Sequence, residues 1–142
     1  MADIERLTKL RDHIAALPPE RFTMNHWACK PDGEYEFQNL DTVDELIHDC
    51  GTCACIGGWT DALFMPPETL FWDGSTPKTG ALLGLDYEES MNLFMPMPAN
   101  TPSWSPYATW RDVTQADAVT TLTKLIETGK VDWSHVQPQT QS

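Results

Sequence analysis

A helix in the middle of the chain is predicted by residues 50–65, which read CGTCACIGGWTDALFM. Thr52 has the side chain of a helix N-cap, so we expect the helix to run over residues 52–65. The apolar residues that follow recur at the spacing of one helix face: Cys55, Ile56, Trp59, Leu63 and Phe64. Gly57 and Gly58 each cost about 1 kcal/mol inside a helix relative to alanine. Their presence therefore indicates that another element packs closely there.

The rest of the chain contains further helix signals. They predict helices over residues 3–17, 76–83, 87–94 and 114–128, with N-caps at Asp3, Thr76, Asp86 and Thr114. Residues 40–49 have apolar side chains at helical spacing among polar ones, which fits either a short helix or an ordered loop. Residues 96–110 hold four Pro, two Trp and one Tyr, and this composition predicts a loop.

These elements predict a mainly α fold in a single compact domain over residues 1–136, with long loops rich in Pro and aromatic residues. We expect little or no sheet, with any strand confined to residues 20–40, and a flexible tail over 137–142. The predicted core side chains are Ile4, Leu7, Leu10, Ile14, Ile56, Trp59, Leu63, Leu122, Leu125 and Ile126.

The charge of the chain is strongly negative. There are 21 Asp and Glu against 9 Lys and Arg, a net charge of −12. This balance argues against nucleic acid and anionic membranes, because both need clustered basic side chains, and it suits a basic protein partner. We also expect no membrane-spanning segment, because no apolar run approaches the ~20 residues that one requires. The first residues lack the features of a secretion signal, so we expect a cytoplasmic protein with reduced thiols.

Several separated motifs carry a family resemblance. The central one is Cys50-Gly51-Thr52 followed by Ala54-Cys55-Ile56 and Gly58-Trp59. The others, in the same order along the chain, are Leu17-Pro18-Pro19-Glu20-Arg21-Phe22 with Met24 and Trp27, Leu82-Leu83-Gly84-Leu85, Leu93-Phe94 with Pro96, and Gly129-Lys130-Val131-Asp132-Trp133. Together they resemble a family of small proteins from bacteriophages and bacteria. The resemblance implies a phage or prophage accessory protein in the host cytosol and no particular biochemical activity. This sequence departs from the family pattern at Cys53.

Our first functional hypothesis is a protein that binds and modulates a host protein, such as a component of a defence system. The acidic charge would meet a basic partner, and the aromatic residues of the 96–110 loop would supply contacts: Trp104, Tyr107 and Trp110. This hypothesis needs no catalytic residue and no cofactor.

The second hypothesis is a cysteine-dependent enzyme. Helix N-termini lower the pKa of a thiol, which favours Cys53 or Cys50 at the start of the 52–65 helix as a nucleophile. His26 would serve as the base, with His48 and His135 as other candidates.

The third hypothesis is a module stabilised by zinc. Its candidate ligands are His26, Cys29, Cys50 and Cys53, which offer the nitrogen and sulfur donors that zinc prefers. Against both hypotheses stands a simpler interpretation, in which Cys50 and Cys55 are small buried apolar side chains.

Overall fold

The computed structural model describes residues 2–24, 28–32, 36–39, 42–48, 52–66, 68–69, 76–95 and 113–136. The predicted aromatic loop over 96–110 and the predicted tail over 137–142 lie outside these residues.

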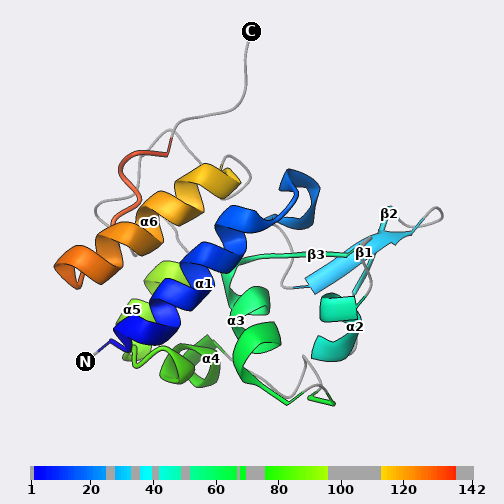
Figure 1. Ribbon diagram of the computed structural model, residues 1–142, viewed down its shortest axis with the longest axis horizontal. Helices are drawn as coiled ribbons and strands as arrows, with labels where there is room; N and C mark the ends of the chain where they lie inside the picture. Colours follow the sequence, from blue (N-terminus) through cyan, green and yellow to red (C-terminus); the bar gives the residue numbers. More distant parts are fainter. Residues whose placement is uncertain are drawn as a thin grey trace, which may run out of the picture.

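The described elements confirm a mainly α fold (Figure 1). Their order is α1 (Ile4–Ala16), η1 (Pro19–Arg21), β1 (Ala28–Asp32), β2 (Glu36–Asn39), α2 (Val43–His48), β3 (Cys53–Ala54), α3 (Ile56–Phe64), α4 (Thr76–Leu82), α5 (Tyr87–Phe94) and α6 (Gln115–Thr128). The segment over residues 40–49, for which the sequence allowed a helix or a loop, contains the short helix α2.

Three of the helices begin at the N-caps that the sequence predicts. The Asp3 carboxylate accepts a hydrogen bond from the backbone at the start of α1. At α5, Asp86 and Glu89 exchange side chain and backbone hydrogen bonds in a capping box. Thr114 and Asp117 do the same at α6. Each cap satisfies N–H groups that the helix itself leaves without partners, which fixes where the helix starts.

The sheet is small and antiparallel, with the strand order β2-β1-β3. Strands β1 and β2 lie within residues 20–40, as predicted, whereas β3 lies at Cys53–Ala54. The helix predicted over residues 52–65 is therefore wrong at its start: α3 begins at Ile56, with Cys55 as its N-cap. The reason is pairing with β1, which draws Cys53 and Ala54 into an extended conformation.

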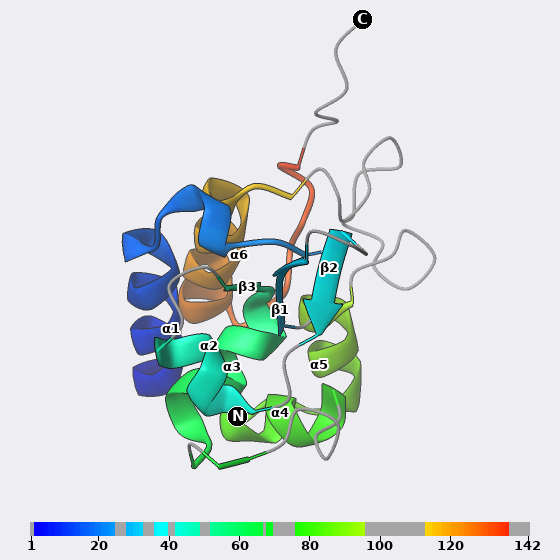
Figure 2. The same cartoon turned by 90° about the vertical axis from the view of Figure 1, so that its right-hand side faces the viewer.

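Most of the helices pack around α3. Helices α1 and α6 lie side by side and run in opposite directions in Figure 1. Helix α3 contacts α1, α2, α4 and α5, and Figure 2 shows it between α1 and α5. The predicted core residues that are buried are Leu7, Leu10, Ile14, Ile56, Trp59, Leu122 and Leu125. Leu63 and Ile126 are partly buried, and Ile4 is 46% exposed, so the prediction for Ile4 was wrong.

A close helix contact at a glycine joins α4 to α5. A Cβ atom on Gly80 would overlap Ser90 Oγ and lie 2.6 Å from Ser90 Cβ. Ser90 is fully buried, so its side chain has little room to move away. Gly57 and Gly58 are buried in α3, and the close neighbour expected there stays a prediction.

Gly80→Ala is expected to destabilise the protein. The added methyl group must push α4 away from α5, and overpacking of this kind costs about 1–3 kcal/mol. Urea unfolding followed by circular dichroism measures the change in the free energy of unfolding.

A second variant identifies the cause. Ser90→Gly removes the atoms that the methyl group would meet, so Gly80→Ala should cost much less in that background than alone. If Gly80→Ala instead stabilised the protein by about 1 kcal/mol, helix propensity would dominate and the close contact would be refuted.

Candidate functional site

Two buried thiols meet where β1 pairs with β3. Cys29 and Cys53 are directly opposite in the antiparallel register, and their Sγ atoms are 3.3 Å apart. Both residues are thiols rather than a disulfide. The sheet therefore brings together two of the four candidate zinc ligands, 24 positions apart in the sequence.

The two thiols differ in acidity. The hydrogen bond with Cys29 lowers the pKa of Cys53 to about 7; burial opposes this shift, and the positive charge of Arg21 supports it. The same hydrogen bond, together with burial, raises the pKa of Cys29. The directions of the two shifts favour Cys53 as the sulfur that ionises first, with the Cys29 thiol then donating to it; while both are protonated, either sulfur can donate.

Arg21 joins the thiol site to α2 and to the segment before β3. Its Nη2 donates to Leu46 O at 2.6 Å and to Thr52 Oγ1 at 3.0 Å, and its Nε donates to Thr52 O at 3.1 Å. The guanidinium carbon lies 5.0 Å from the centre of the Trp59 ring, within the range of a cation–π contact. The Thr52 hydroxyl in turn donates to Leu46 O, so it does not cap a helix as predicted.

Trp59 forms a hydrogen bond with Arg21 and a ring contact with α1. Its Nε1 donates to Arg21 O at 3.1 Å, and the His13 ring packs 4.8 Å from it. Burial, and secondarily the charge of Arg21, lowers the pKa of His13, so its neutral form is favoured. In the part of the chain that the structure describes, His13 Nε2 is a buried atom without a hydrogen-bond partner.

Sequence patterns did not reveal the roles of Arg21 and His13. Arg21 appeared only within a family motif, and His13 was an ordinary position of the 3–17 helix. Both contact residues that are remote in the sequence, and no local spacing encodes such contacts.

The thiol at the start of α3 is not activated. Cys55 is the N-cap of this helix, but burial raises its pKa to about 11 and outweighs the stabilising N–H groups of Gly57 and Gly58. The thiolate hypothesis named Cys53 and Cys50 as nucleophiles and stays a prediction; only the placement of Cys53 at the helix start was wrong. Cys53 precedes the helix, in β3, and its lowered pKa comes from Cys29 and Arg21.

The other predicted site residues lie outside the described residues: His26, Cys50, Trp104, Tyr107 and Trp110. Among the described residues, no group of three or more His, Cys, Asp or Glu side chains could hold a metal ion. Two sulfurs on one tetrahedral zinc would lie about 3.8 Å apart, given Zn–S bonds of about 2.3 Å, so the sulfurs of Cys29 and Cys53 lie closer than zinc requires. The zinc hypothesis stays a prediction.

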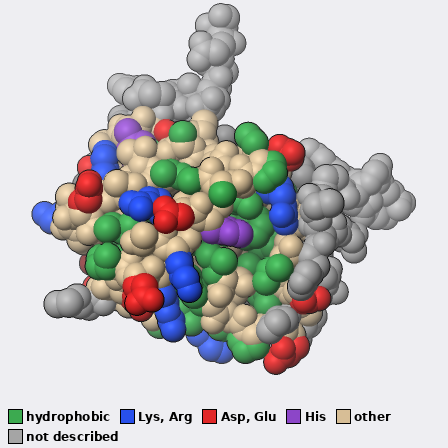
Figure 3. Space-filling model, in the orientation of Figure 1, with side chains coloured by type: hydrophobic (Ala, Val, Ile, Leu, Met, Phe, Trp, Pro, Cys, Tyr) green, Lys and Arg blue, Asp and Glu red, His purple; other side chains and the backbone are tan. Residues whose placement is uncertain are grey.

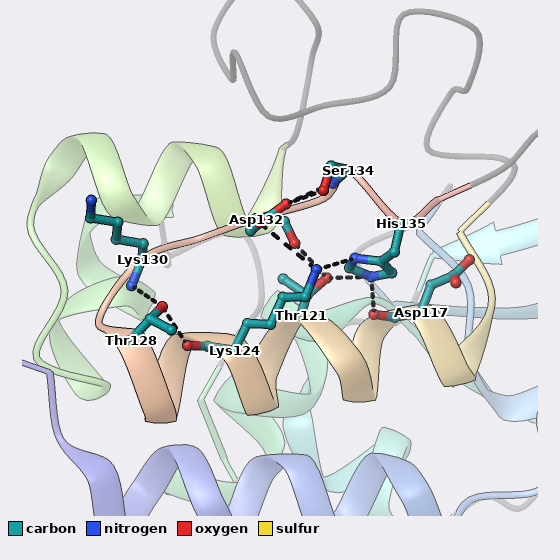
Figure 4. Close-up of polar contacts among 8 residues, drawn as sticks. All are labelled: Asp117, Thr121, Lys124, Thr128, Lys130, Asp132, Ser134 and His135. Carbon is teal, nitrogen blue, oxygen red and sulfur yellow. Dashed lines mark hydrogen bonds and ion pairs between the residues drawn. The ribbon is translucent and has the colours of Figure 1, made fainter.

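A second polar cluster fastens the C-terminal segment to α6 (Figure 4). His135 Nε2 lies 3.0 Å from Asp117 O and 3.1 Å from Thr121 Oγ1, and Nδ1 lies 3.3 Å from Lys124 Nζ. Because a carbonyl oxygen only accepts, Nε2 carries the proton and Nδ1 accepts from Lys124. Both ring nitrogens are therefore occupied in holding the segment, which suits a structural role.

Asp132 strengthens this cluster. Its carboxylate accepts hydrogen bonds from the Ser134 hydroxyl and backbone N–H, and it lies 3.7 Å from Lys124 Nζ. The bonds from Ser134 lower the pKa of Asp132 most; burial opposes them, and the charge of Lys124 adds to them. The neighbouring Trp133 is buried and donates to Asn92 O of α5. The segment after α6 is thus held against two helices.

Comparisons with protein-family models, curated proteins and solved structures find no match for this chain. Its likeness to the phage family accordingly stays a hypothesis drawn from its motifs. Over the described residues, no helix is long and apolar enough to cross a membrane.

Cys53 is expected to be the first described thiol to react with a small alkylating reagent. With a pKa of about 7, its rate should rise about tenfold between pH 6 and pH 8 and then level off. A thiol at the ordinary value would rise about a hundredfold over that interval and continue upward. Peptide mapping by mass spectrometry after timed iodoacetamide exposure measures each cysteine separately.

Cys55 and Arg21 supply the controls. Cys55 should stay unlabelled while the protein is folded, because it is buried and its pKa is raised. Arg21→Gln should shift the Cys53 profile to higher pH, since a supporting positive charge is lost. A Cys53 rate that keeps rising through pH 9 in the unaltered protein would contradict the lowered pKa.

Proposed function

We propose that this chain is a phage-type accessory protein that acts in the host cytosol by binding a host protein through an acidic and aromatic surface. The partner presents a basic patch. Binding covers this patch and thereby modulates the activity of the partner. A component of a host defence system is one such partner. The proposed surface comprises the start of α5, with Tyr87 and Glu88, and the predicted loop residues Trp104, Tyr107 and Trp110.

The observation that carries this proposal is the exposure of Tyr87 in a segment without positive charge. Tyr87 is 65% exposed, the most exposed large apolar side chain among the described residues. Asp86 and Glu88 flank it, and residues 79–110 contain no Lys or Arg. Tyrosine is enriched where proteins bind one another. The negative electrostatic field of the acidic residues favours a positively charged partner.

Other parts of the surface suit a basic partner less well. Figure 3 shows Lys and Arg side chains interspersed with Asp and Glu on the face that α1 and α6 cross in Figure 1. On α1 alone, the acidic Glu5 and Asp12 accompany three basic side chains: Arg6, Lys9 and Arg11. Mixed charges partly cancel one another, so the start of α5 is the better candidate.

Several basic side chains are also engaged within the chain. Arg21 bonds to backbone and hydroxyl oxygens, and Lys124 contacts His135 and Asp132. Arg6 donates to Leu82 O and pairs with Asp3. These contacts hold the three basic side chains to acceptor groups of the chain itself.

The enzyme hypothesis has one observation in its favour, the lowered pKa of Cys53. The described histidines with known contacts are engaged elsewhere, His13 on Trp59 and His135 on α6. His26, the base predicted for such an enzyme, lies outside the described residues, so the enzyme hypothesis stays a prediction, and binding is the function that we propose.

The experiment has two stages. Immobilised protein first captures partners from lysate of a host bacterium at low salt, and each candidate is then purified and its Kd measured by calorimetry. A true partner binds saturably, and its affinity falls as salt rises, because exposed charges are screened. Tyr87→Ala should weaken binding at least 30-fold, the effect of losing a hot-spot side chain worth about 2 kcal/mol. Trp104→Ala should also weaken it.

A pair of matched variants separates local charge from total charge. Glu88→Lys and Glu5→Lys make the same change at exposed positions in the first turn of a helix. Only Glu88→Lys should weaken binding, by about tenfold. If both variants weakened binding equally, or if Tyr87→Ala left the Kd unchanged, the proposed surface would be wrong.

A further inference from the structure

The sheet holds two thiols in the arrangement that precedes a disulfide. Cys29 and Cys53 are directly opposite on antiparallel strands, with Sγ atoms 3.3 Å apart. We propose that Cys29 and Cys53 form a redox-active pair, which a small peroxide oxidises to a reversible disulfide between β1 and β3. This proposal goes beyond partner binding and does not depend on it.

The backbone already satisfies the geometric requirement. Opposite residues on antiparallel strands have Cα atoms about 4.5–5.5 Å apart, and disulfides form at Cα separations of about 4.4–6.8 Å. The sulfurs need to approach by only about 1.3 Å to reach the bond length of about 2.0 Å. Side chain rotation can supply this movement while the strands stay paired.

Access decides which sulfur reacts first and with what. Cys53 is 6% exposed and Cys29 is 0% exposed, so an oxidant reaches Cys53. So small an exposed fraction favours a small molecule over a bulky one, which makes hydrogen peroxide the fitting oxidant. Cys53 is also the sulfur of the pair whose pKa is lowered, and thiolates rather than thiols attack peroxides.

The reaction balances with one peroxide. The Cys53 thiolate attacks one peroxide oxygen and breaks the O–O bond, forming a sulfenic acid and hydroxide. The Cys29 sulfur then attacks the Cys53 sulfur and displaces its hydroxyl group, which leaves as water with the proton from Cys29. The pair loses two electrons and hydrogen peroxide gains them, giving one water and one hydroxide; the hydroxide takes up the proton that Cys53 released on ionising and becomes the second water. A small dithiol reverses the change by thiol–disulfide exchange.

The disulfide would change the surroundings of Arg21. The negative charge of the Cys53 thiolate disappears, so the guanidinium loses an electrostatic partner. The bond also joins β3, the strand before α3, to β1. It closes a loop of chain between residues 29 and 53, which reduces the conformational freedom of the unfolded state. The oxidised protein should therefore melt at a higher temperature than the reduced protein.

The test treats the full, reduced protein with hydrogen peroxide at pH 7, followed by alkylation, proteolysis without reductant and mass spectrometry. The expected product is a cross-linked peptide containing Cys29 and Cys53, lighter by two hydrogen atoms than the two separate peptides. Dithiothreitol should restore both thiols and the original melting temperature. Cys55 should remain a thiol throughout, because burial raises its pKa.

Three variants define the pair. Cys50→Ser should form the same disulfide at the same rate, whereas Cys53→Ser should leave Cys29 reduced. In Cys29→Ser, Cys53 should stop at the sulfenic acid, which dimedone traps. The proposal is overturned if peroxide converts Cys53 to a sulfinic acid in the unaltered protein, or if the recovered disulfide joins Cys50 to Cys53 or links two chains. Mapping of the unaltered protein decides the matter even if a variant fails to fold.

Discussion

The side chain of Arg21 connects parts of the molecule that are distant in the sequence. It donates hydrogen bonds to Leu46 O of α2 and to Thr52 beside β3, and it lies over the Trp59 ring of α3. Trp59 returns a hydrogen bond to Arg21 O, so each residue fixes the position of the other. The placement of β3 against β1 depends on this arrangement, and the Cys29–Cys53 pair depends on β3. A planar group with several donors suits this role, which lysine could not fill.

The helices could be predicted because their signals are local. Asp3, Asp86 and Thr114 cap the helices where the sequence indicated, because a cap needs only the next few residues. The start of α3 could not be predicted in this way. Thr52 looks like an N-cap, but its hydroxyl bonds to Leu46 O, and the following two residues pair with a strand some 24 positions earlier. Tertiary pairing therefore overrides the local signal.

The same limit applies to the candidate site. Cysteine spacing drew attention to Cys29 and Cys53, but it did not predict that they would pair across a sheet. The thiolate was expected from a helix terminus, whereas Cys53 gains its acidity from Cys29 and Arg21. The acidic, aromatic character of the proposed binding surface was evident from composition. Its described member Tyr87 was missed, because helical spacing alone does not show which side chain the other helices leave uncovered.

The most direct measurement compares the stability of two arginine variants by urea unfolding. Arg21→Met removes the hydrogen bonds to Leu46 and Thr52, and it should lower the free energy of unfolding by about 2–4 kcal/mol. Arg11→Met is the matched control, because Arg11 pairs only with its exposed neighbour Asp12 among the contacts described, and it should lose less than about 1 kcal/mol. Equal losses for the two variants would contradict the central role of Arg21.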